Sequence, residues 1–232
     1  MRTIICAGPP TSGKTTVLKQ VARRLIGRGH KLAYLKTDVQ YTNEEEEFRA
    51  RFGIPAKKVY SGELCPDHCN VMVLGDAVRW AASEHADTLL VETAGLCLRC
   101  SPYIEDSLGI AVLEATSGMN LPRKMGPLLS LSDVAVVTKI DLISQAEREV
   151  FRAAVLAATR ASVIETDALH GINIDRLVTR VEHAPEISGR LMLRGNPPVG
   201  VCTICVGKRE IGWQQHFGVV RQLEGETFYR GE

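Results

Sequence analysis

The chain has 232 residues, of which 45% are hydrophobic, and its 28 basic and 27 acidic residues nearly balance. This length suits one α/β domain with a buried core, and the balanced charge argues against a nucleic-acid or anionic-membrane partner. The sequence contains no run of about 18 apolar residues, the length that could span a bilayer. Because a core-like apolar run begins at Thr3, we expect no signal peptide and a cytoplasmic protein.

A phosphate-binding loop follows the first apolar run. Residues 8–15 read GPPTSGKT, which matches G-x-x-x-x-G-K-[ST] at every fixed position, between a strand-like and a helix-like segment. Glycines let backbone N–H groups close around phosphates, Lys14 would contact the β- and γ-phosphates, and the Thr15 hydroxyl would bind Mg²⁺. The predicted phosphate-binding residues are Gly8, Ser12, Gly13, Lys14, Thr15 and Thr16.

Strand-like apolar runs alternate with helix-like stretches up to about residue 185. This alternation predicts an α/β fold of the P-loop NTPase kind, with a mostly parallel sheet flanked by helices. Ser144 is a candidate N-cap, and four glutamates at 44–47 are interpreted as a solvated helix start. The predicted strands are 3–7, 31–37, 88–93, 109–115, 134–139 and 161–166, and the predicted helices are 14–28, 69–85, 145–160 and 172–182.

Acidic residues occur at the ends of two predicted strands. Asp38 follows the second strand in KTDVQYT, and Glu92 ends TLLVE directly before Thr-Ala-Gly95. Because α/β proteins bind ligands at the carboxyl ends of parallel strands, Asp38 and Glu92 are candidate Mg²⁺ ligands together with Thr15. Asp38 could also orient the attacking water, and the Gly95 N–H could sense the γ-phosphate. Lys14, Asp38, Glu92 and Gly95 are therefore the predicted catalytic residues.

The sequence TKID at residues 138–141 follows another predicted strand and fits [NT]-K-x-D, the pattern of guanine-binding proteins. The Asp141 carboxylate would accept hydrogen bonds from guanine N1–H and the 2-amino group, and the Lys139 stem would pack on the base. Adenine lacks this donor pair, so such a site prefers GTP. Thr138 belongs to the same motif, and Asp167 and Ala168 in TDALHG would place backbone near the guanine.

Six of the seven cysteines occur in pairs, which in a reducing compartment indicates metal or redox chemistry. Thiolates and an imidazole suit Zn²⁺, Ni²⁺ or Cu⁺. The tail pair supplies half of a four-thiolate site, whose other half would come from CLRC, His216 or a second copy of the chain. The lone Cys6 is interpreted as a small core residue. The predicted ligands are Cys65, His68 and Cys69 in CPDHC, Cys97 and Cys100 in CLRC, and Cys202 and Cys205 in CTIC.

The texture of the sequence changes near Ala184, where a connection rich in Gly and Pro begins. We therefore predict a P-loop GTPase domain at 1–185 and a small extension with CxxC at 186–232. The extension could form two or three short strands, and it is too small to fold alone without a metal or a partner surface.

Together these motifs resemble the SIMIBI-class metallochaperone GTPases of the urease-accessory and hydrogenase-maturation type. The resemblance covers about residues 1–183 and includes GPPTSGKT, KTDVQYTNEE, the glutamate segment before CPDHC, and LPRKMGPLLSLSDVAVVTKID, in the family's order. It implies a nucleotide-gated homodimer that binds GTP and Mg²⁺ and carries a metal, usually nickel, to a client apo-metalloenzyme or accessory protein. Cys65 and His68 correspond to the interface Cys-Pro-His ligands of that family.

The chain also departs from the family pattern. CPDHC contains an inserted Asp, ETAG is closer to the cobalamin-related branch, and CLRC and CTIC are additional. These thiols leave zinc and an iron–sulfur cluster open beside nickel. The alternative function is a nucleotide-dependent iron–sulfur cluster carrier or electron donor with a cluster shared between two chains. Pro9, where such proteins usually have a lysine, and TKID favour the GTPase. A small-molecule kinase would explain the P-loop but neither the cysteines nor TKID.

Overall fold

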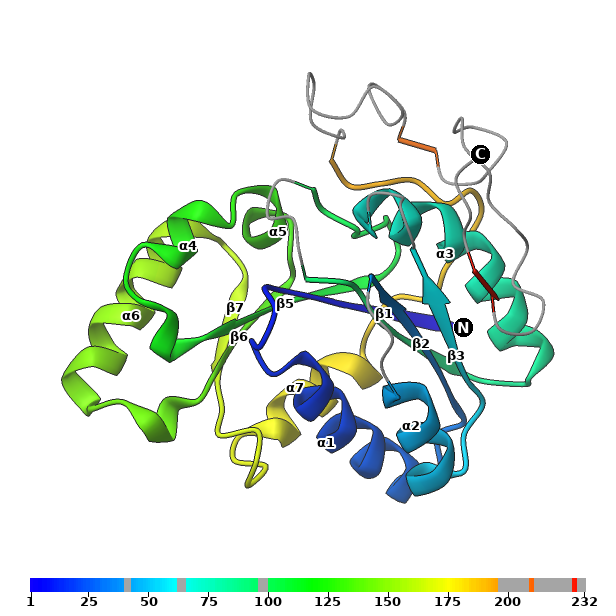
Figure 1. Ribbon diagram of the computed structural model, residues 1–232, viewed down its shortest axis with the longest axis horizontal. Coiled ribbons are helices and arrows are strands. Elements are labelled where there is room, and N and C mark those ends of the chain that lie inside the picture. Colours follow the sequence, from blue (N-terminus) through cyan, green and yellow to red (C-terminus); the bar gives the residue numbers. More distant parts are fainter. Residues whose placement is uncertain (40–42, 62–65, 96–99, 196–208, 211–226, 229–232) are drawn as a thin grey trace.

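The computed structural model describes residues 1–39, 43–61, 66–95, 100–195, 209–210 and 227–228 (Figure 1). Its strands form one parallel sheet in the order β7-β6-β5-β1-β4-β2-β3-β8. The predicted parallel α/β fold is therefore confirmed. The strands are β1 (Arg2–Ala7), β2 (Leu32–Asp38), β3 (Ala56–Tyr60), β4 (Thr88–Glu92), β5 (Leu108–Glu114), β6 (Val134–Thr138), β7 (Ser162–Glu165) and β8 (Thr227–Phe228).

Helices cover both faces of the sheet. Apolar side chains of α1, α2 and α7 pack on one face, and those of α3, α5 and α6 pack on the other. Among the described residues, no helix is both long and apolar enough to cross a membrane. The helices are α1 (Lys14–Gly27), α2 (Glu44–Phe52), α3 (Pro66–Ser83), α4 (Leu121–Lys124), α5 (Pro127–Ser130), α6 (Gln145–Ala158) and α7 (Ile174–Glu182), and two short 3₁₀ turns are η1 (Ala115–Ser117) and η2 (Ile140–Leu142).

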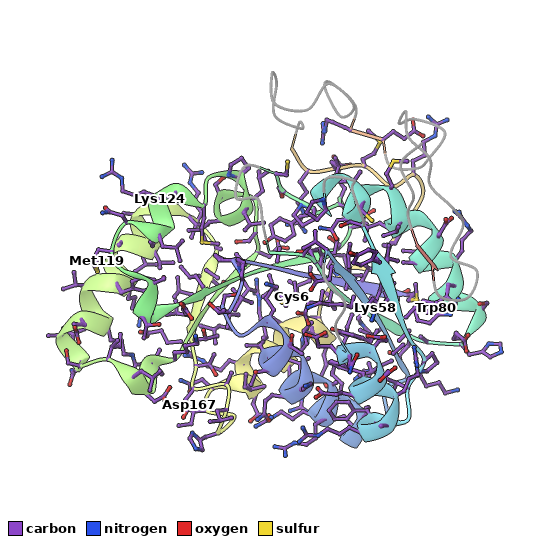
Figure 2. All side chains as sticks on the ribbon, viewed as in Figure 1. Cys6, Lys58, Trp80, Met119, Lys124 and Asp167 are labelled. Atoms are coloured by element: carbon purple, nitrogen blue, oxygen red, sulfur yellow. The ribbon has the colours of Figure 1, made fainter. Side chains whose placement is uncertain are left out.

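The central strand β1 explains how the core is built. Its side chains alternate, so that Ile4 and Cys6 face the α1 layer whereas Ile5 and Ala7 face the α3 layer, and all four are fully buried. A strand buried on both faces needs a nearly continuous apolar run, which Ile4 to Ala7 supply. The predicted core role of Cys6 is thereby confirmed, and Figure 2 shows this residue in the interior of the molecule.

Parallel pairing gathers the predicted motifs at one edge. β1 pairs with β4 and β5, while β2 pairs with β4 and β6 pairs with β5. Because all these strands run in the same direction, their carboxyl ends lie at the same edge of the sheet. The P-loop, Asp38, Glu92 and TKID therefore meet at this edge.

Some elements differ from the sequence prediction. β3 was not predicted, because AKKVY places two lysines in a five-residue strand. α3 begins at Pro66 rather than near 69, and proline suits the first position of a helix. The glutamate run does start α2, but the view of it as solvated is wrong for Glu45, which is buried and bonded to Lys58 at 3.1 Å. Ser144 caps α6 in a complete capping box, as predicted.

The beginning of the predicted extension packs on the sheet domain. Leu193 is 2% exposed and belongs to the core cluster on the α3 face. The Arg194 guanidinium donates to the carbonyls of Ile104 and Leu131, both at 3.0 Å, and pairs with Asp133 at 2.8 Å. Beyond residue 195 only residues 209–210 and β8 are described, and β8 pairs in parallel with β3. The boundary at 185 stays a prediction.

Candidate functional site

The phosphate-binding loop lies between β1 and α1 and is shaped by glycines. A Cβ atom on Gly8 would come within 2.1 Å of the Val112 carbonyl oxygen, and Gly13 has a φ of 91°. The Lys14 ammonium donates to the carbonyl oxygens of Gly8 and Pro9, at 3.0 and 2.9 Å. Burial lowers the pKa of Lys14, and the negative charge of Glu92, which acts to raise it, offsets this only in part. The ammonium is thus held in the loop by carbonyls that phosphate oxygens can replace.

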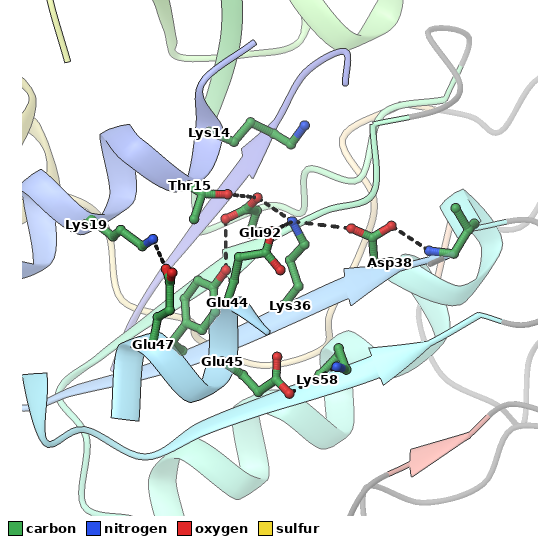
Figure 3. A network of polar contacts seen from close by, with 12 residues as sticks. Lys14, Thr15, Lys19, Lys36, Asp38, Glu44, Glu45, Glu47, Lys58 and Glu92 are labelled. Carbon is green, nitrogen blue, oxygen red and sulfur yellow. Dashed lines mark hydrogen bonds and ion pairs between the residues drawn. The ribbon is translucent and has the colours of Figure 1, made fainter. Parts of the chain in front are cut away.

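Glu92, at the end of β4, receives three hydrogen bonds from the α1 face of the sheet (Figure 3). The Thr15 hydroxyl donates to Oε1 at 2.7 Å, the Lys36 ammonium to the same oxygen at 2.6 Å, and the Tyr34 hydroxyl to Oε2 at 2.8 Å. The carboxylate is almost completely buried, with 1% exposed. Burial and the charge of Glu92 raise the pKa of Tyr34, so this hydroxyl remains a donor.

Lys36 and Glu92 meet because they are register partners on neighbouring strands β2 and β4. The Lys36 ammonium also lies 3.4 Å from Oδ2 of Asp38 and 3.8 Å from Oε1 of Glu44 at the start of α2. Burial alone would lower the pKa of Lys36, but the charge of Glu92 and its hydrogen bond raise it. The sequence reasoning missed Lys36 and Glu44. A lysine within an otherwise apolar strand, two residues before a strand-end Asp, was the signal that could have revealed it.

A cavity of about 490 Å³ opens beside these groups. Gly95 lies against the loop, where a Cβ atom would come within 2.6 Å of the Gly8 carbonyl oxygen and 2.7 Å of the Pro10 nitrogen. The structure thus brings the phosphate loop together with Asp38, Glu92 and Gly95, the residues predicted to contact the phosphates and Mg²⁺. The lining residues are Pro10, Thr11, Gly13, Lys14, Thr15, Thr16, Lys36, Asp38, Val39, Glu44, Glu92, Thr93 and Gly95.

The donor set of this cavity fits a magnesium–phosphate ligand. Mg²⁺ prefers hard oxygen ligands and is usually held by one or two protein groups together with substrate phosphates. The Thr15 hydroxyl and the Glu92 carboxylate are such oxygens, and they lie 2.7 Å apart beside the loop. Lys14 and the backbone N–H groups at the start of α1 suit phosphate oxygens.

The predicted guanine-binding residues are connected to the loop but do not line this cavity. The Thr138 hydroxyl donates to the Ser12 carbonyl at 2.7 Å, so TKID braces the loop. Lys139 adopts a left-handed conformation with φ 57° and its ammonium pairs with Glu114, while the Asp141 side chain is exposed. This arrangement leaves Asp141 accessible to a base.

Asp167 and Ala168 form a buried turn after β7. The Asp167 carboxylate accepts the backbone N–H groups of Leu169 and His170, at 3.1 and 3.2 Å, and also contacts the His170 ring. Desolvation raises the pKa of Asp167, but the hydrogen bonds from His170 lower it overall. Gln20 of α1 donates to the Leu169 carbonyl at 3.1 Å, which ties this turn to the helix that follows the phosphate loop.

The predicted transition-metal ligands are only partly within the described structure. Cys69 on α3 is fully buried in the apolar cluster, and Cys100 is partly exposed. Within the described ranges, no three His, Cys, Asp or Glu side chains gather as a metal site. The remaining predicted ligands stay predictions, because Cys65, Cys97, Cys202, Cys205 and the side chain of His68 lie outside the described residues.

Comparison with known proteins gives a consistent picture. The sequence profile of the family described as CobW/HypB/UreG, nucleotide-binding domain, matches residues 2–165. An uncharacterised protein of Methanocaldococcus jannaschii is 41% identical over 235 aligned positions, which cover 100% of both chains. Urease accessory protein UreG 2 of Streptomyces griseus is 32% identical over 193 positions, which cover 75% of this chain and 84% of the relative.

Solved structures share the fold. The hydrogenase maturation factor HypB from Archaeoglobus fulgidus superposes with a TM-score of 0.62 at 22% identity, covering 78% of this chain and 89% of the other. HypB from Helicobacter pylori, solved in complex with nickel, gives 0.60 at 16% identity, covering 82% and 91%. At these identities the likeness establishes the architecture alone.

Proposed function

The chain belongs to the CobW/HypB/UreG family of nucleotide-binding domains, and we propose that it is a Mg²⁺-dependent GTPase that delivers a metal ion to a client apo-metalloenzyme. The observation that carries the nucleotide part is the pairing of Thr15 with Glu92 at 2.7 Å, beside a cavity that both residues line together with Lys14. Strand-end carboxylates and a loop lysine are the groups that phosphoryl transfer requires.

Each group has a role that its position supports. Lys14 exchanges the Gly8 and Pro9 carbonyls for phosphate oxygens, which are stronger, charge-assisted partners. Thr15 and Glu92 would hold Mg²⁺, which neutralises charge on the β- and γ-phosphates when bound. Asp38 lines the same cavity and orients the attacking water. The Gly95 backbone, packed against the loop, senses whether a γ-phosphate is present.

GTP hydrolysis tests the nucleotide part. We expect wild type to hydrolyse GTP with Mg²⁺ and to prefer it clearly over ATP. Glu92→Gln should lose at least about 100-fold in rate, because the carboxylate charge is removed from a buried site. Glu182→Gln is the matched control, since Glu182 lies on α7 and pairs with Arg28. Equal hydrolysis of ATP and GTP by wild type would contradict the guanine assignment.

Two cysteine segments follow cavity-side residues closely in the sequence, which supports coupling between the nucleotide and the metal. The Ser61 backbone N–H donates to the Asp38 carbonyl at 2.9 Å, and CPDHC begins four residues after Ser61. Cys100 comes five residues after Gly95. Contacts with the γ-phosphate can therefore reposition both segments. We propose that Cys65, His68 and Cys69 bind a nickel-like or zinc ion at a nucleotide-gated homodimer interface, where Cys69, fully buried in the structure, becomes a ligand only once the start of α3 has been repositioned.

The described residues that follow CLRC and the tail pair in the sequence are linked by backbone hydrogen bonds. The Arg194 N–H donates to the Tyr103 carbonyl at 3.0 Å, and the Leu193 N–H donates to the Arg209 carbonyl at 2.7 Å. Cys100 precedes Tyr103 by three residues and Cys205 precedes Arg209 by four. At about 3.5 Å per extended residue, the two pairs are within reach of each other. Cys97, Cys100, Cys202 and Cys205 would supply one four-thiolate site.

Metal analysis distinguishes a zinc or nickel site from the alternative, an iron–sulfur cluster. Protein purified without oxygen should hold zinc or nickel and no iron, and the ratio of metal to protein should fall in Cys97→Ser with Cys100→Ser. Cys6→Ala is the control, because Cys6 lies in the core. A brown protein with broad visible absorption would instead support the iron–sulfur carrier.

Titration of metal into Cys65→Ser with Cys69→Ser, with and without GTP, tests whether CPDHC binds the metal. Unchanged binding in both conditions would exclude CPDHC from the site.

A further inference from the structure

The buried ammonium of Lys36 lies among the carboxylates that border the phosphate cavity. Only 6% of the Lys36 side chain is exposed, and its Nζ lies 2.6 Å from Oε1 of Glu92. The same nitrogen is 3.4 Å from Oδ2 of Asp38 and 3.8 Å from Oε1 of Glu44 (Figure 3). Carboxylates from β4, β2 and α2 thus surround a cation that belongs to the chain itself.

Lys36 shares its main partner with the threonine of the phosphate loop. The Thr15 hydroxyl and the Lys36 ammonium both donate to Oε1 of Glu92, at 2.7 and 2.6 Å. Thr15 and Glu92 are the two side chains to which the proposed function assigns Mg²⁺. A divalent cation on these oxygens and an ammonium on Oε1 would repel each other strongly, because the Glu92 carboxylate and the Lys36 side chain are both buried. Lys36 and Mg²⁺ therefore compete for one carboxylate.

The triphosphate of GTP changes this balance because it brings its own negative charge into the cavity. Lys36 lines that cavity together with Lys14 and Gly95. Its four-carbon stem is flexible, and an ammonium can exchange one anionic oxygen for another. An ammonium that leaves Glu92 therefore finds phosphate oxygens in the same cavity, and its departure frees Oε1 for the metal ion.

We propose that Lys36 is a tethered cation that occupies the Mg²⁺ subsite in the nucleotide-free protein and transfers its ammonium to the terminal phosphate when Mg²⁺ and GTP bind together. This inference rests on the proposed function, since the ligand that displaces the Lys36 ammonium from Glu92 is Mg²⁺ bound together with GTP. Two consequences follow. The protein excludes a divalent ion until nucleotide arrives, and a second lysine besides Lys14 contacts the phosphates.

A neighbouring lysine provides a matched control. Lys58 on β3 is the register partner of Lys36 and is also largely buried, with 12% of its side chain exposed. It pairs with Glu45 of α2 at 3.1 Å, but it does not line the phosphate cavity. Substitution of either lysine by methionine removes one charge from the same part of the sheet, and only Lys36→Met removes it from the cavity.

The first experiment titrates Mn²⁺, a spectroscopic substitute for Mg²⁺, into nucleotide-free protein and measures free Mn²⁺ by electron paramagnetic resonance. We expect Lys36→Met to bind Mn²⁺ at least about tenfold more tightly than wild type, because the carboxylates lose their competing cation. Lys58→Met should resemble wild type. Lys36→Met binding no more tightly than wild type, or Lys58→Met gaining as much, overturns the proposal.

The second experiment repeats the titration with GTP. In wild type GTP should tighten Mn²⁺ binding by a large factor, and in Lys36→Met this factor should be at least about tenfold smaller. Lys36→Gln keeps a hydrogen-bond donor to Glu92 without the charge, so it decides the question if circular dichroism shows Lys36→Met to be unfolded. A protein that binds no GTP would refute the proposed function, whereas the nucleotide-free titration would still decide the role of Lys36.

Discussion

At the proposed phosphate end of the site, around Lys14 and Glu92, the functional groups are buried and already bonded, whereas at the proposed base end, around Lys139 and Asp141, they are largely open to solvent. Lys14 and Glu92 are 7% and 1% exposed, and each has hydrogen-bond partners from the loop or the neighbouring strands. At the base end Asp141 is exposed, and the Lys139 ammonium, 36% of whose side chain is exposed, pairs with Glu114. Thr138 connects the two ends by its hydrogen bond to Ser12.

This difference separates two tasks of nucleotide recognition. Phosphate groups are common to all nucleoside triphosphates, so a preorganised charged cavity supplies affinity without distinguishing the base. An exposed carboxylate such as Asp141 contributes little until a base covers it and excludes water, and it then rejects any base that leaves it unpaired. We therefore expect changes at the phosphate end to abolish binding and changes at the base end to alter selectivity.

The largest expected effect is that of Lys14→Ala. Loss of a buried ammonium from the phosphate loop removes charge-assisted bonds to the phosphates, so affinity for GTP should fall by about 1,000-fold or more. Fluorescence titration with a labelled GTP analogue measures this. Lys19→Ala is the control, because Lys19 on the same helix pairs with Glu47. Loss of less than about tenfold would show that Lys14 does not bind the phosphates.

The next effect is that of Asp141→Asn, which should lower the ratio of GTP to ATP affinity by about 100-fold while ATP affinity stays nearly constant. The reason is that an amide cannot accept both guanine N–H groups as a carboxylate does. Asp175→Asn on α7 tests whether loss of a negative charge alone changes binding. An equal loss of GTP and ATP affinity would show that Asp141 supports the phosphates rather than the base.

The proximity of the phosphate loop, Asp38 and Glu92 could be predicted from the sequence because these motifs stand at strand ends. In a parallel sheet the order and direction of strands decide which ends meet, so GPPTSGKT, Asp38 and Glu92 could be placed together without coordinates. Side-chain partners across strands could not be predicted, because they depend on register. Lys36 meets Glu92 only because β2 and β4 pair with these two residues opposite each other.

The glutamate run shows a second limit. Composition correctly indicated a helix start, since four acidic residues suit the first turn of a helix. It could not show that Glu44 turns toward Lys36 or that Glu45 meets Lys58, because those lysines come from strands brought alongside α2 by the fold. The same reasoning explains why β3, a short strand with two lysines, was not predicted from apolar patterning.

A smaller effect should follow from Gly95→Ala. The added Cβ atom would lie 2.8 Å from the Lys14 ammonium and closer still to backbone atoms of the phosphate loop, so the loop must shift. Such overpacking typically costs about 1–3 kcal/mol, and GTP affinity should fall by about tenfold. Gly27→Ala is the control, since no atom beyond its chain neighbours and the backbone of its own helix lies within 4 Å of the added Cβ. Equal binding by Gly95→Ala and wild type would show that the loop tolerates the shift.

Below the phosphate loop, strand β1 carries a buried thiol, that of Cys6, which resists ionisation. Burial, with a further contribution from the charge of Glu92, raises the pKa of the Cys6 thiol above its ordinary value of 9.0. The folded protein therefore keeps this proton at a pH where the unfolded chain releases it. A raised folded pKa stabilises the protein fully below the ordinary value, and the contribution is lost as pH rises above it.

The smallest effect is therefore a difference in the pH dependence of stability between wild type and Cys6→Ala. Near pH 7.5 we expect wild type to be more stable by about 1 kcal/mol, because the substitution leaves a small gap in the core. Near pH 10 the difference should change by about 1.4 kcal/mol and so reverse slightly in favour of Cys6→Ala, because only wild type carries the Cys6 thiol, which ionises in the unfolded chain but not in the folded one, whereas the other six cysteines are common to both proteins. Lys14, Lys36 and Tyr34 titrate in both proteins, so the difference isolates the thiol. Urea unfolding at the two pH values measures it, and a constant difference would mean that the Cys6 thiol ionises as readily in the folded protein as in the unfolded chain.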